Sequence, residues 1–406
     1  MKLLYLNFDH GIPVCGDKGA SVHVRAFIGA AHRLGHEVAL ACATLGSGNP
    51  PPPALILPLC PRPGLADPDV EDPMLAKEQV KLASDKAAPA HVLAALTAEG
   101  FRPDMIYERH ALFHAAGAEI AARLGIPRLL EVNAPLVEEQ KRFRGLCLED
   151  EARQIERRSY ESADAIIAVS EAVGRHVRDV LDQQHNVHVV PNGVDVEAYG
   201  QIETTRQAMR QHLGLAMRAP VAGFIGSFKP WHGVPFLLEA FAAIAAKITD
   251  LHLLAIGEGP EREAVLARAA ALGLAARVLL PGRVAHTEVP AWLSAMDFTV
   301  APYLPQSDFY FSPLKIAESM AAARPVLAPD TGAISQMVTH RRNGLLFPPG
   351  DLAACTAGLE ELAMDGQARA AMGAAAQHEA QQWGWQQVVR HSLNLAPPSS
   401  VRQPAA

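Results

Sequence analysis

A chain of 406 residues is too long for one ordinary hydrophobic core, so its length predicts two domains. Hydrophobic side chains make up 49% of the sequence and charged ones 19%, which is typical of a globular protein rich in buried sheet. The formal net charge of −7 excludes a general affinity for nucleic acid as the expected function.

The cysteine spacing and the apolar runs bear on the cellular compartment. The five cysteines are odd in number and show no Cys-x-x-Cys spacing, which favours reduced thiols over a disulfide framework or a zinc site. The apolar run at the N-terminus is too short for a signal peptide and is interrupted by Asp9 and His10. No stretch reaches the roughly 18 apolar residues that a membrane-spanning helix needs. The sequence therefore predicts a soluble, cytoplasmic protein.

Short aliphatic runs alternate with helical patterns along the first half of the chain. A strand at 2–8 precedes a helix at 19–35, where apolar residues recur at helical spacing and a glycine supplies the stop. The strand 36–43 follows, and a segment rich in glycine and proline at 46–53 breaks the pattern. Further strands are predicted at 104–107, 127–132, 164–169 and 187–190.

The alternation restarts after a turn-rich segment at 191–200. Strands are predicted at 219–227, 251–257, 276–282, 297–303 and 324–330. Continuous apolar strands between helices predict parallel sheets covered on both faces, so we read the chain as two doubly wound α/β domains. In such sheets, ligands bind beyond the carboxyl ends of the strands.

The predicted domain boundaries follow from this alternation. The first domain covers 1–198 and the second covers 199–378. A long last helix at about 367–394 is predicted to return to the first domain through its part at 379–395. The tail 396–406 is predicted to be disordered.

The helix start in "SPLKIAES" combines a lysine and a glutamate on one face. Ser312 is predicted to be the N-cap of a helix whose first position is Pro313. The free amides of Leu314 and Lys315 would form an anion site together with the helix dipole and the lysine charge. Glu318 shares that face, and its carboxylate could accept hydrogen bonds from both hydroxyls of a ribose. The alternative is an ordinary capped helix with a Lys–Glu surface pair.

Glycine-containing loops follow predicted strands in both domains. In the first domain, Gly16 and Gly19 let the backbone approach a ligand, and Lys18 stands beside the helix start. This loop is not Gly-x-Gly-x-x-Gly, and no acidic residue ends the next strand, so a nicotinamide cofactor is not indicated. The corresponding residues of the second domain are Gly226, Ser227, Lys229, His232 and Gly257. For Lys229 and His232, a solvated loop is the alternative.

Eight segments of the sequence form an ordered series. They are "KGASVHVRAFIGAAHRLGHEV" (18–38), "ADAIIAVSEAV" (163–173), "VVPNGVD" (189–195), "GSFKPWHGVPFLLEAF" (226–241), "LLAIGEGPERE" (253–263), "GRVAHTEVPAWLSAMDFTVAPY" (282–303), "SPLKIAESMAAARPVLAPDTG" (312–332) and "NGLLFPPGD" (343–351). Taken in this order, they resemble the family 4 glycosyltransferases of the GT-B fold, which are retaining enzymes that use nucleotide sugars. The resemblance implies two Rossmann-like domains whose parallel sheets face each other across a cleft.

The resemblance implies roles around the helix at 312–322. Glu318 matches the last glutamate of the family's Glu-x7-Glu motif, which holds the donor ribose. The first glutamate of that motif, which meets the donor sugar, is replaced by Tyr310, and Asp308 is a nearby candidate to substitute for it. The SPLK form is similar to a variant branch in which Ser312, Leu314 and Lys315 surround the phosphates.

The diphosphate loop departs from the family pattern. The family usually has arginine and lysine where this chain has Ser227 and His232. The resemblance therefore implies a cationic clamp formed by Lys229, His232 and Lys315. Arg283 falls where the family's backbone pairs with the nucleobase.

In the first domain, the family's histidine near the transferred sugar corresponds to Asn133. An amide cannot act as a general base, so Glu131 is the titratable candidate. His110 is a further candidate at the end of the preceding strand, together with Glu108 and Arg109. A buried Glu108–Arg109 pair that only organises the loop is the alternative.

The function implied is transfer of a sugar, with retention, from a nucleoside-diphosphate sugar to a glycan, lipid-linked or small-molecule hydroxyl in polysaccharide or glycoconjugate assembly. No Asp-x-Asp pair occurs in a suitable strand context, so neither a metal nor a cofactor is expected. Two alternatives stay open: a sugar-nucleotide epimerase or hydrolase of the same fold, and a nucleotide-sugar-binding protein without turnover.

A basic segment of the first domain bears on membrane contact. It comprises 141–145 with Arg153, Arg157 and Arg158. One reading is a solvated helix face balanced by glutamates. The other is docking to a lipid-linked or anionic acceptor, which would place a cytoplasmic enzyme peripherally at the inner face of the membrane.

Overall fold

The computed structural model describes residues 1–64, 71–181, 186–199, 202–305, 309–310 and 312–397. Contacts divide the chain into two compact units. Unit 1 comprises Met1–Asn192 with Trp385–Ala406, and unit 2 comprises Gly193–Gly384. The chain passes from unit 1 to unit 2 inside the turn-rich segment 191–200.

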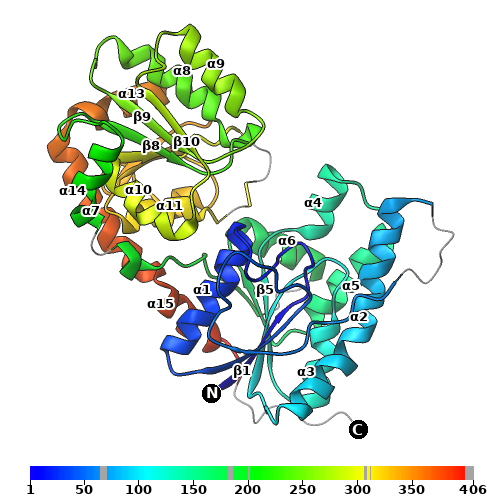
Figure 1. Cartoon of the computed structure of the whole chain (residues 1–406). Helices are drawn as coiled ribbons and strands as arrows, with labels where there is room; N and C mark the ends of the chain where they lie inside the picture. The colour runs from blue at the N-terminus through cyan, green and yellow to red at the C-terminus, as the bar shows by residue number, and fades with distance from the viewer. Residues whose placement is uncertain (65–70, 182–185, 200–201, 306–308, 311, 398–406) are drawn as a thin grey trace. The chain divides into compact units, whose positions relative to one another are not determined.

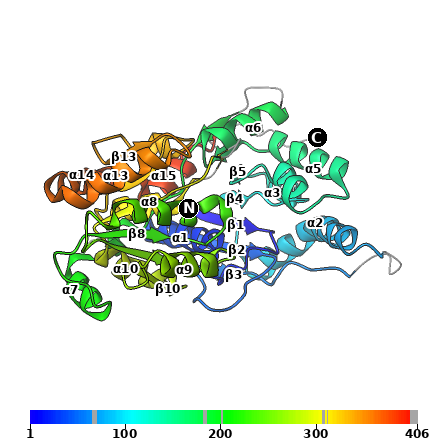
Figure 2. The same cartoon turned by 90° about the horizontal axis from the view of Figure 1, so that it is seen from above.

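Unit 1 is built on a parallel sheet of seven strands within the described residues, in the order β3-β2-β1-β4-β5-β6-β7. Figure 2 shows the labels from β3 to β5 following one another in this order. Each predicted strand of this half of the chain is confirmed, and the short edge strand β3 was not predicted. The strands are β1 (Lys2–Asn7), β2 (Glu37–Cys42), β3 (Leu55–Ile56), β4 (Met105–Arg109), β5 (Arg128–Val132), β6 (Ala165–Ala168) and β7 (Val187–Val189).

Helices cover both faces of this sheet (Figure 1). One face packs against α1 and α15, and the other packs against α2 and α3. Trp385, at the start of α15, joins the core that α1 forms with the sheet. The helices of unit 1 are α1 (Gly19–Arg33), α2 (Pro73–Ala98), α3 (Ala116–Leu124), α4 (Leu136–Phe143), α5 (Glu149–Glu161), α6 (Glu171–Leu181) and α15 (Trp385–Leu393).

Unit 2 contains a second parallel sheet, with six strands in the order β10-β9-β8-β11-β12-β13 among the residues that the structure describes. Its strands are mostly apolar, as expected for a parallel sheet that is covered on both faces. The five predicted strands are confirmed, and β13 was not predicted. The strands are β8 (Val221–Ile225), β9 (His252–Ile256), β10 (Val278–Gly282), β11 (Phe298–Val300), β12 (Val326–Pro329) and β13 (Gly344–Phe347).

Two hydrophobic cores lie on the two faces of the unit 2 sheet. Helices α8, α9 and α13 cover one face, and α7, α10, α11 and α14 contribute to the core on the other. Figure 2 shows α13 and α14, which are in contact, side by side. The helices of unit 2 are α7 (Ile202–His212), α8 (Val234–Ala245), α9 (Arg262–Ala271), α10 (Val289–Ala295), α11 (Leu314–Ala321), α12 (Ile334–Met337), α13 (Leu352–Met364) and α14 (Gly366–Ala380).

Two predicted helix boundaries are wrong. The single helix predicted at about 367–394 is broken into α14, a 3₁₀ turn at Gln381–Trp383 and α15. The break coincides with a backbone bridge between Val194 and Gly384. Helix α11 begins at Leu314, so Pro313 takes the capping position that was predicted for Ser312, and proline has no side-chain acceptor to offer.

The strand orders place one topological switch point in each sheet. The order reverses between β1 and β4 in unit 1 and between β8 and β11 in unit 2. Loops that leave the carboxyl ends of two such strands diverge and leave room for a ligand. The loops after β1 and β4, and those after β8 and β11, are therefore the expected binding loops.

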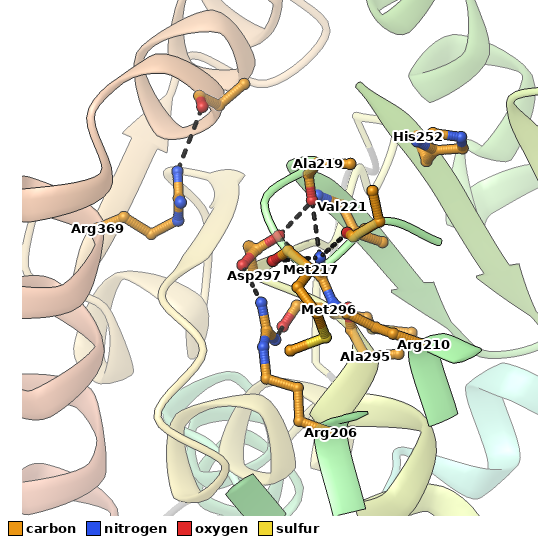
Figure 3. Close-up of polar contacts among 12 residues, drawn as sticks. Arg206, Arg210, Met217, Ala219, Val221, His252, Ala295, Met296, Asp297 and Arg369 are labelled. Carbon is orange, nitrogen blue, oxygen red and sulfur yellow. Dashed lines mark hydrogen bonds and ion pairs between the residues drawn. The ribbon is translucent and has the colours of Figure 1, made fainter. Parts of the chain in front are cut away.

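The opposite, amino-terminal edge of the unit 2 sheet is fixed by a buried ion cluster. Figure 3 shows Arg206 and Arg210, from α7, converging on Asp297 just before β11. The amide of Val221 at the start of β8 also donates to Asp297, at 2.8 Å. The cluster ties α7 to the two central strands.

In the part of the chain that the structure describes, no helix is both long enough and apolar enough to span a bilayer.

Candidate active site

The loop after β8 forms the base of the candidate site. It contains a 3₁₀ turn at Pro230–His232. The amide of Gly226 donates to the carbonyl of Ile256 at 3.0 Å, and a Cβ on Gly257 would lie 1.8 Å from the Gly226 carbonyl oxygen. Gly226 and Gly257 have φ values of 147° and 140°, which other residues rarely adopt. These two predicted glycines therefore let neighbouring loops pack backbone to backbone.

Lys315 is the central side chain of the site. It is the second residue of α11, and Nζ lies 4.7 Å from the ring centre of Phe224 and 4.8 Å from that of Tyr303. Nζ is buried and has no hydrogen-bond partner among the described residues. Burial lowers the pKa of Lys315 to about 7, although the nearby Glu318 acts to raise it. A buried ammonium with unused donors is suited to an anionic ligand.

The geometry explains why position 226 is a glycine for a second reason. A Cβ on Gly226 would lie 2.6 Å from Nζ of Lys315. Phe224 belongs to β8, and Tyr303 follows β11, so the two rings come from the strands that flank the switch point. Lys315 is therefore held where an α/β sheet of this order is expected to bind its ligand.

His232 lies beside Lys315. Its Nδ1 is 2.5 Å from the carbonyl oxygen of Ser227 and 3.1 Å from the Ser227 hydroxyl oxygen. Because a carbonyl oxygen only accepts, Nδ1 carries the proton of the neutral ring and Nε2 carries the lone pair. Burial and the charge of Lys315 lower the pKa of His232 to about 3. His232 is thus a neutral ring at pH 7, which differs from the cation that the clamp prediction assumed.

Lys229, the third predicted cation, is exposed. Its ammonium lies 4.9 Å from the ring centre of Trp231 in the same loop. Its charge still acts on His232, whose pKa it helps to lower. Of the three predicted cations, Lys315 is central, His232 is neutral and Lys229 is at the surface.

Glu318 lies one turn after Lys315 on α11, as the spacing predicts. Its Oε1 is 2.8 Å from Nε2 of His286, which lies in the 3₁₀ turn His286–Glu288 after β10. The Glu318 side chain is 14% exposed, whereas that of His286 is 42% exposed. His286 therefore holds one oxygen of the carboxylate and leaves Glu318 partly open to solvent.

Three further residues of unit 2 were predicted to contact the donor. Arg283 directly follows β10 and is exposed. Tyr310 is half-buried. Asp308 lies outside the described residues. Their assigned roles stay predictions.

In unit 1, Glu131 is the centre of a buried network. It is 3% exposed, and it accepts a hydrogen bond from the Tyr107 hydroxyl at 3.1 Å and one from Arg109 at 3.4 Å. Nε2 of His23 lies 2.8 Å from its Oε1. Burial alone would raise the pKa of Glu131, but the nearby charges of His23 and Arg109 outweigh it and lower the pKa to about 2. These contacts favour a structural role for Glu131. Catalytic roles for Glu131 and Asn133 stay predictions.

The alternative of a Glu108–Arg109 pair is wrong, because each residue has another partner. The Arg128 guanidinium lies 2.5 Å from Glu108, and Arg109 turns to Glu131. Adjacent residues of a strand point to opposite faces of the sheet, so the two side chains cannot meet. His110 is 6% exposed, and its Nε2 lies 3.9 Å from Glu156. The role of His110 stays a prediction.

The first loop of unit 1 is held by its own contacts. Nζ of Lys18 donates to the carbonyl of Gly11 at 2.8 Å. Arg25 donates to the carbonyl of Gly16 at 2.7 Å, and Gly19 begins α1. These contacts keep the loop compact at the carboxyl end of β1.

Three side chains of the unit 2 site were not predicted. Phe224 is internal to a strand, so only the tertiary structure places it beside a lysine from α11. Tyr303 closes the predicted strand 297–303, and its place at a carboxyl end is a signal that could have identified it. His286 stands in a turn whose sequence carries no sign of its partner Glu318.

Solved structures share this arrangement of sheets. HepE from Anabaena, in complex with UDP, is 19% identical, with a TM-score of 0.70 over 97% of this chain and 99% of that one. WaaG, a glycosyltransferase involved in lipopolysaccharide biosynthesis, is 14% identical, with a TM-score of 0.68 over 97% of this chain and 99% of that one. In the part of the chain that the structure describes, the two parallel sheets therefore have the GT-B fold.

Sequence comparisons identify the family. A model of Glycosyltransferase Family 4 matches residues 18–198, and one of group 1 glycosyl transferases matches residues 219–365. A D-inositol 3-phosphate glycosyltransferase from Jonesia denitrificans is 31% identical over 300 residues, which is 70% of this chain and 68% of that protein. One from Xylanimonas cellulosilytica is 27% identical over 97% of this chain and 95% of that protein. The chain belongs to the family 4 glycosyltransferases, enzymes that transfer sugar from a nucleotide-sugar donor.

Proposed function

We propose that the protein is a retaining glycosyltransferase that moves a sugar from a nucleoside-diphosphate sugar to a hydroxyl of a glycan, lipid-linked or small-molecule acceptor. The observation that supports this most is the buried ammonium of Lys315, which has no hydrogen-bond partner among the described residues. Glu318 on the next turn of the same helix adds an acceptor for the ribose. The spacing of the two side chains suits a nucleoside diphosphate.

The proposed mechanism relies on this chain's own donors. Lys315 and the free amides at the start of α11 stabilise the negative charge that develops on the departing diphosphate. His232 donates a hydrogen bond from Nδ1 to the carbonyl oxygen of Ser227, so the neutral ring supports the loop. The ring takes a positive charge only when a bound anion favours a second proton on Nε2. The acceptor hydroxyl attacks the anomeric carbon from the face that the diphosphate leaves. The bond from that carbon to the diphosphate oxygen breaks, and the hydroxyl proton passes to the departing diphosphate. Charge on the leaving group is met by protein cations.

The acceptor is proposed from the relatives and from unit 1. The relatives named above act on D-inositol 3-phosphate, and a further one is a GDP-mannose-dependent mannosyltransferase of phosphatidylinositol monomannoside, from Mycobacterium tuberculosis, that is 26% identical over 58% of this chain and 62% of that protein. We propose that this chain likewise acts on a polyol or glycan hydroxyl, in polysaccharide or glycoconjugate assembly.

The basic segment of unit 1 bears on the proposed location. Lys141 pairs with Glu149 at 2.9 Å, and Arg153 also pairs with Glu149, at 2.8 Å, which supports a solvated helix face. Phe143 is nevertheless 60% exposed at the end of α4. A cytoplasmic location with peripheral contact at the inner membrane face is consistent with an exposed aromatic among basic residues.

A donor screen tests the proposal. Thermal shifts are recorded with UDP-, GDP-, ADP- and CMP-sugars, because a ligand that binds only the folded state raises its stability. Release of the nucleoside phosphate is then measured with and without an acceptor panel. We expect release that depends on acceptor. Release without acceptor would instead indicate an epimerase or hydrolase, and a thermal shift without release would indicate a binding protein.

Glu318→Ala is expected to weaken donor binding about 10- to 100-fold, because a hydrogen bond to a charged group contributes about 1.5–3 kcal/mol. Calorimetry with the donor chosen by the screen measures the change. The matched control is Glu361→Ala on α13, where the glutamate pairs with Arg341 at the surface and its loss should leave donor affinity unchanged. Equal affinities of Glu318→Ala and the parent protein would remove the ribose assignment.

His286→Gln is expected to raise the donor KM severalfold and to change kcat little, because His286 positions the Glu318 carboxylate through the 2.8 Å contact. The readout is the split between KM and kcat in steady-state kinetics, together with the penalty for a 2′-deoxy donor. If His286 orients the Glu318 carboxylate that accepts from the ribose, the loss of affinity caused by a 2′-deoxy donor should be smaller in the variant than in the parent protein. A fall in kcat with an unchanged KM would contradict this role.

A further inference from the structure

A small well lies at the switch point of the unit 1 sheet, at an edge that the donor assignment does not use. We call it the β1/β4 well. Its walls come from the loop after β1, the loop after β4 and helix α2. It is lined by Phe8, Asp9, His10, Lys81, Leu112 and His114. Because the strand order reverses between β1 and β4, this is the place in the sheet where a ligand is expected.

His114 is the best-buried polar side chain of the β1/β4 well. It is 3% exposed, and its ring stacks on that of Phe8, with centroids 5.6 Å apart. Neither ring nitrogen has a hydrogen-bond partner among the described residues. The nearest carboxylate oxygen, Oδ1 of Asp85, is 3.7 Å from Nδ1 and already accepts from the amides of Ala115 and Ala116 at 2.8 and 2.7 Å. A buried imidazole without partners calls for a ligand or another explanation.

Lys81 supplies the charge of the β1/β4 well. Within the described residues its ammonium makes no hydrogen bond or ion pair, and it lies 5.7 Å from the ring centre of Phe113. Burial lowers the pKa of Lys81, although Asp9 and Glu78 act to raise it. Burial also lowers the pKa of His10, and the charges of His114 and Arg62 lower it further. The basic groups therefore crowd one another. Nε2 of His10 lies 3.5 Å from the Ser84 hydroxyl oxygen, and that hydroxyl donates to the carbonyl of Pro61.

The nearby carboxylates are engaged elsewhere. Asp9 accepts from the amide of Gly11 at 2.7 Å. Glu78 accepts from the amides of Cys147 and Leu148, with the shortest contact at 2.8 Å. Their charges are thus partly satisfied by backbone donors, and the donors of Lys81 and His114 stay available for an incoming acceptor.

We propose that the β1/β4 well binds a phosphate group carried by the acceptor substrate, with Lys81, His10 and His114 as its donors. The proposal rests on the glycosyltransferase function proposed above, because it names the chemical class of acceptor that unit 1 would hold. A phosphate supplies several oxygen acceptors to Lys81 and His114, whose side chains have no hydrogen-bond acceptor among the described residues. The acceptor hydroxyl would then be fixed by an anionic anchor on the same molecule.

The test uses the full chain carrying Lys315→Met, so that the donor site cannot hold phosphate through that ammonium. Inorganic phosphate, glucose 6-phosphate and glucose are titrated by calorimetry and by the ring signals of labelled histidine, with that of His114 assigned from His114→Gln. Vesicles of phosphatidylcholine with and without phosphatidylglycerol form the lipid arm. We expect the phosphates to bind and glucose to fail.

Lys81→Met, added to this protein, is expected to weaken phosphate binding at least about tenfold, which matches the loss of a charged hydrogen bond. Lys86→Met is the matched control, because Lys86 is an exposed lysine of the same helix. His10→Gln serves as a second variant if Lys81→Met does not fold. Binding confined to phosphatidylglycerol vesicles, and sensitive to Lys81→Met, would support the proposal and identify a lipid headgroup as the source of the phosphate.

Three results would overturn the proposal. They are phosphate binding that survives both Lys81→Met and His10→Gln, glucose binding as tight as that of its phosphate, and absence of binding in every arm. The donor thermal shift separates this failure from failure of the proposed function. Lys81→Met in the otherwise unchanged chain should keep that shift, because the donor residues lie in unit 2.

Discussion

Lys315→Met is expected to lower the rate of sugar transfer at least about 100-fold and to raise the melting temperature of the protein. The rate falls because the ammonium held between Phe224 and Tyr303 is placed to meet the charge of the leaving diphosphate, and removal of one such donor typically costs about 10²–10³ in kcat. Initial rates with a saturating donor measure the first effect, and calorimetric unfolding measures the second.

The expected rise in stability follows from the pKa of Lys315. Burial lowers that pKa from the ordinary 10.5 to about 7, so between these pH values the unfolded chain binds more protons at this position than the folded one. The cost of burying the charge is fully present below pH 7 and is relieved as pH rises toward 10.5. Methionine fills the space between the rings without a charge, so its advantage should be largest below pH 7 and should shrink at pH 9.

Donor affinity should depend on pH in the opposite sense to stability. A bound diphosphate favours the charged lysine, so the donor binds best below pH 7, and affinity falls as pH rises above the free pKa of about 7. The slope should vanish in Lys315→Met. Lys247→Met, on a surface lysine that pairs with Glu360, is the control that should change neither rate nor slope. Full transfer activity in Lys315→Met would contradict the site.

The class of fold could be predicted from local patterns, because the length of each apolar run and the turn residues that flank it separate buried parallel strands from helices. The eleven predicted strands correspond to β1, β2 and β4 to β12. The two strands that were not predicted are edge strands, and β3 has only two residues, Leu55–Ile56, between prolines. Such short segments owe their conformation to the neighbouring strand rather than to their own sequence.

Helix α2 shows a different limit. It runs for 26 residues from Pro73 to Ala98, capped by Asp72, and it carries Pro89 in its interior. An internal proline normally disfavours a continuous helix, and no helix was predicted for this segment. Buried residues on both sides of Pro89 pack against the rest of unit 1, and this packing holds the helix together. Tertiary contacts outweigh local propensity in this element.

Only part of the candidate site could likewise be predicted from local sequence. Lys315 and Glu318 could be placed on one face because three residues is a helical spacing, and the structure bears out that geometry. The rings around Lys315 come from β8 and from the end of β11, and His286 comes from a turn after β10, so no local pattern joins them to α11. Residues that share an element were predictable, whereas partners brought by sheet topology were not.

Asp297→Asn is expected to reduce the free energy of unfolding by about 3–5 kcal/mol, the usual cost of leaving a buried charge without its partner. Asp297 accepts from Arg206 at 2.5 Å and from Arg210 at 2.6 Å (Figure 3). Arg210 is fully buried and donates to the carbonyls of Ala216 and Ala219 at 2.8 and 2.9 Å, so it cannot turn to water when its counter-charge is removed. Urea unfolding followed by circular dichroism measures the change.

The position of this cluster makes its effect separable from catalysis. Asp297 precedes β11, and Val221 begins β8, so both lie at the amino-terminal edge of the sheet, whereas Lys315 lies beyond the carboxyl ends of the same strands. We therefore expect Asp297→Asn to lower the urea midpoint while the folded protein keeps its donor affinity. Asp250 is exposed, so Asp250→Asn is the control and should change neither the urea midpoint nor the donor affinity. If Asp297→Asn lowered donor affinity in the folded protein, the two edges of the sheet would be coupled. If the urea midpoint were unchanged, Arg210 would not need its counter-charge.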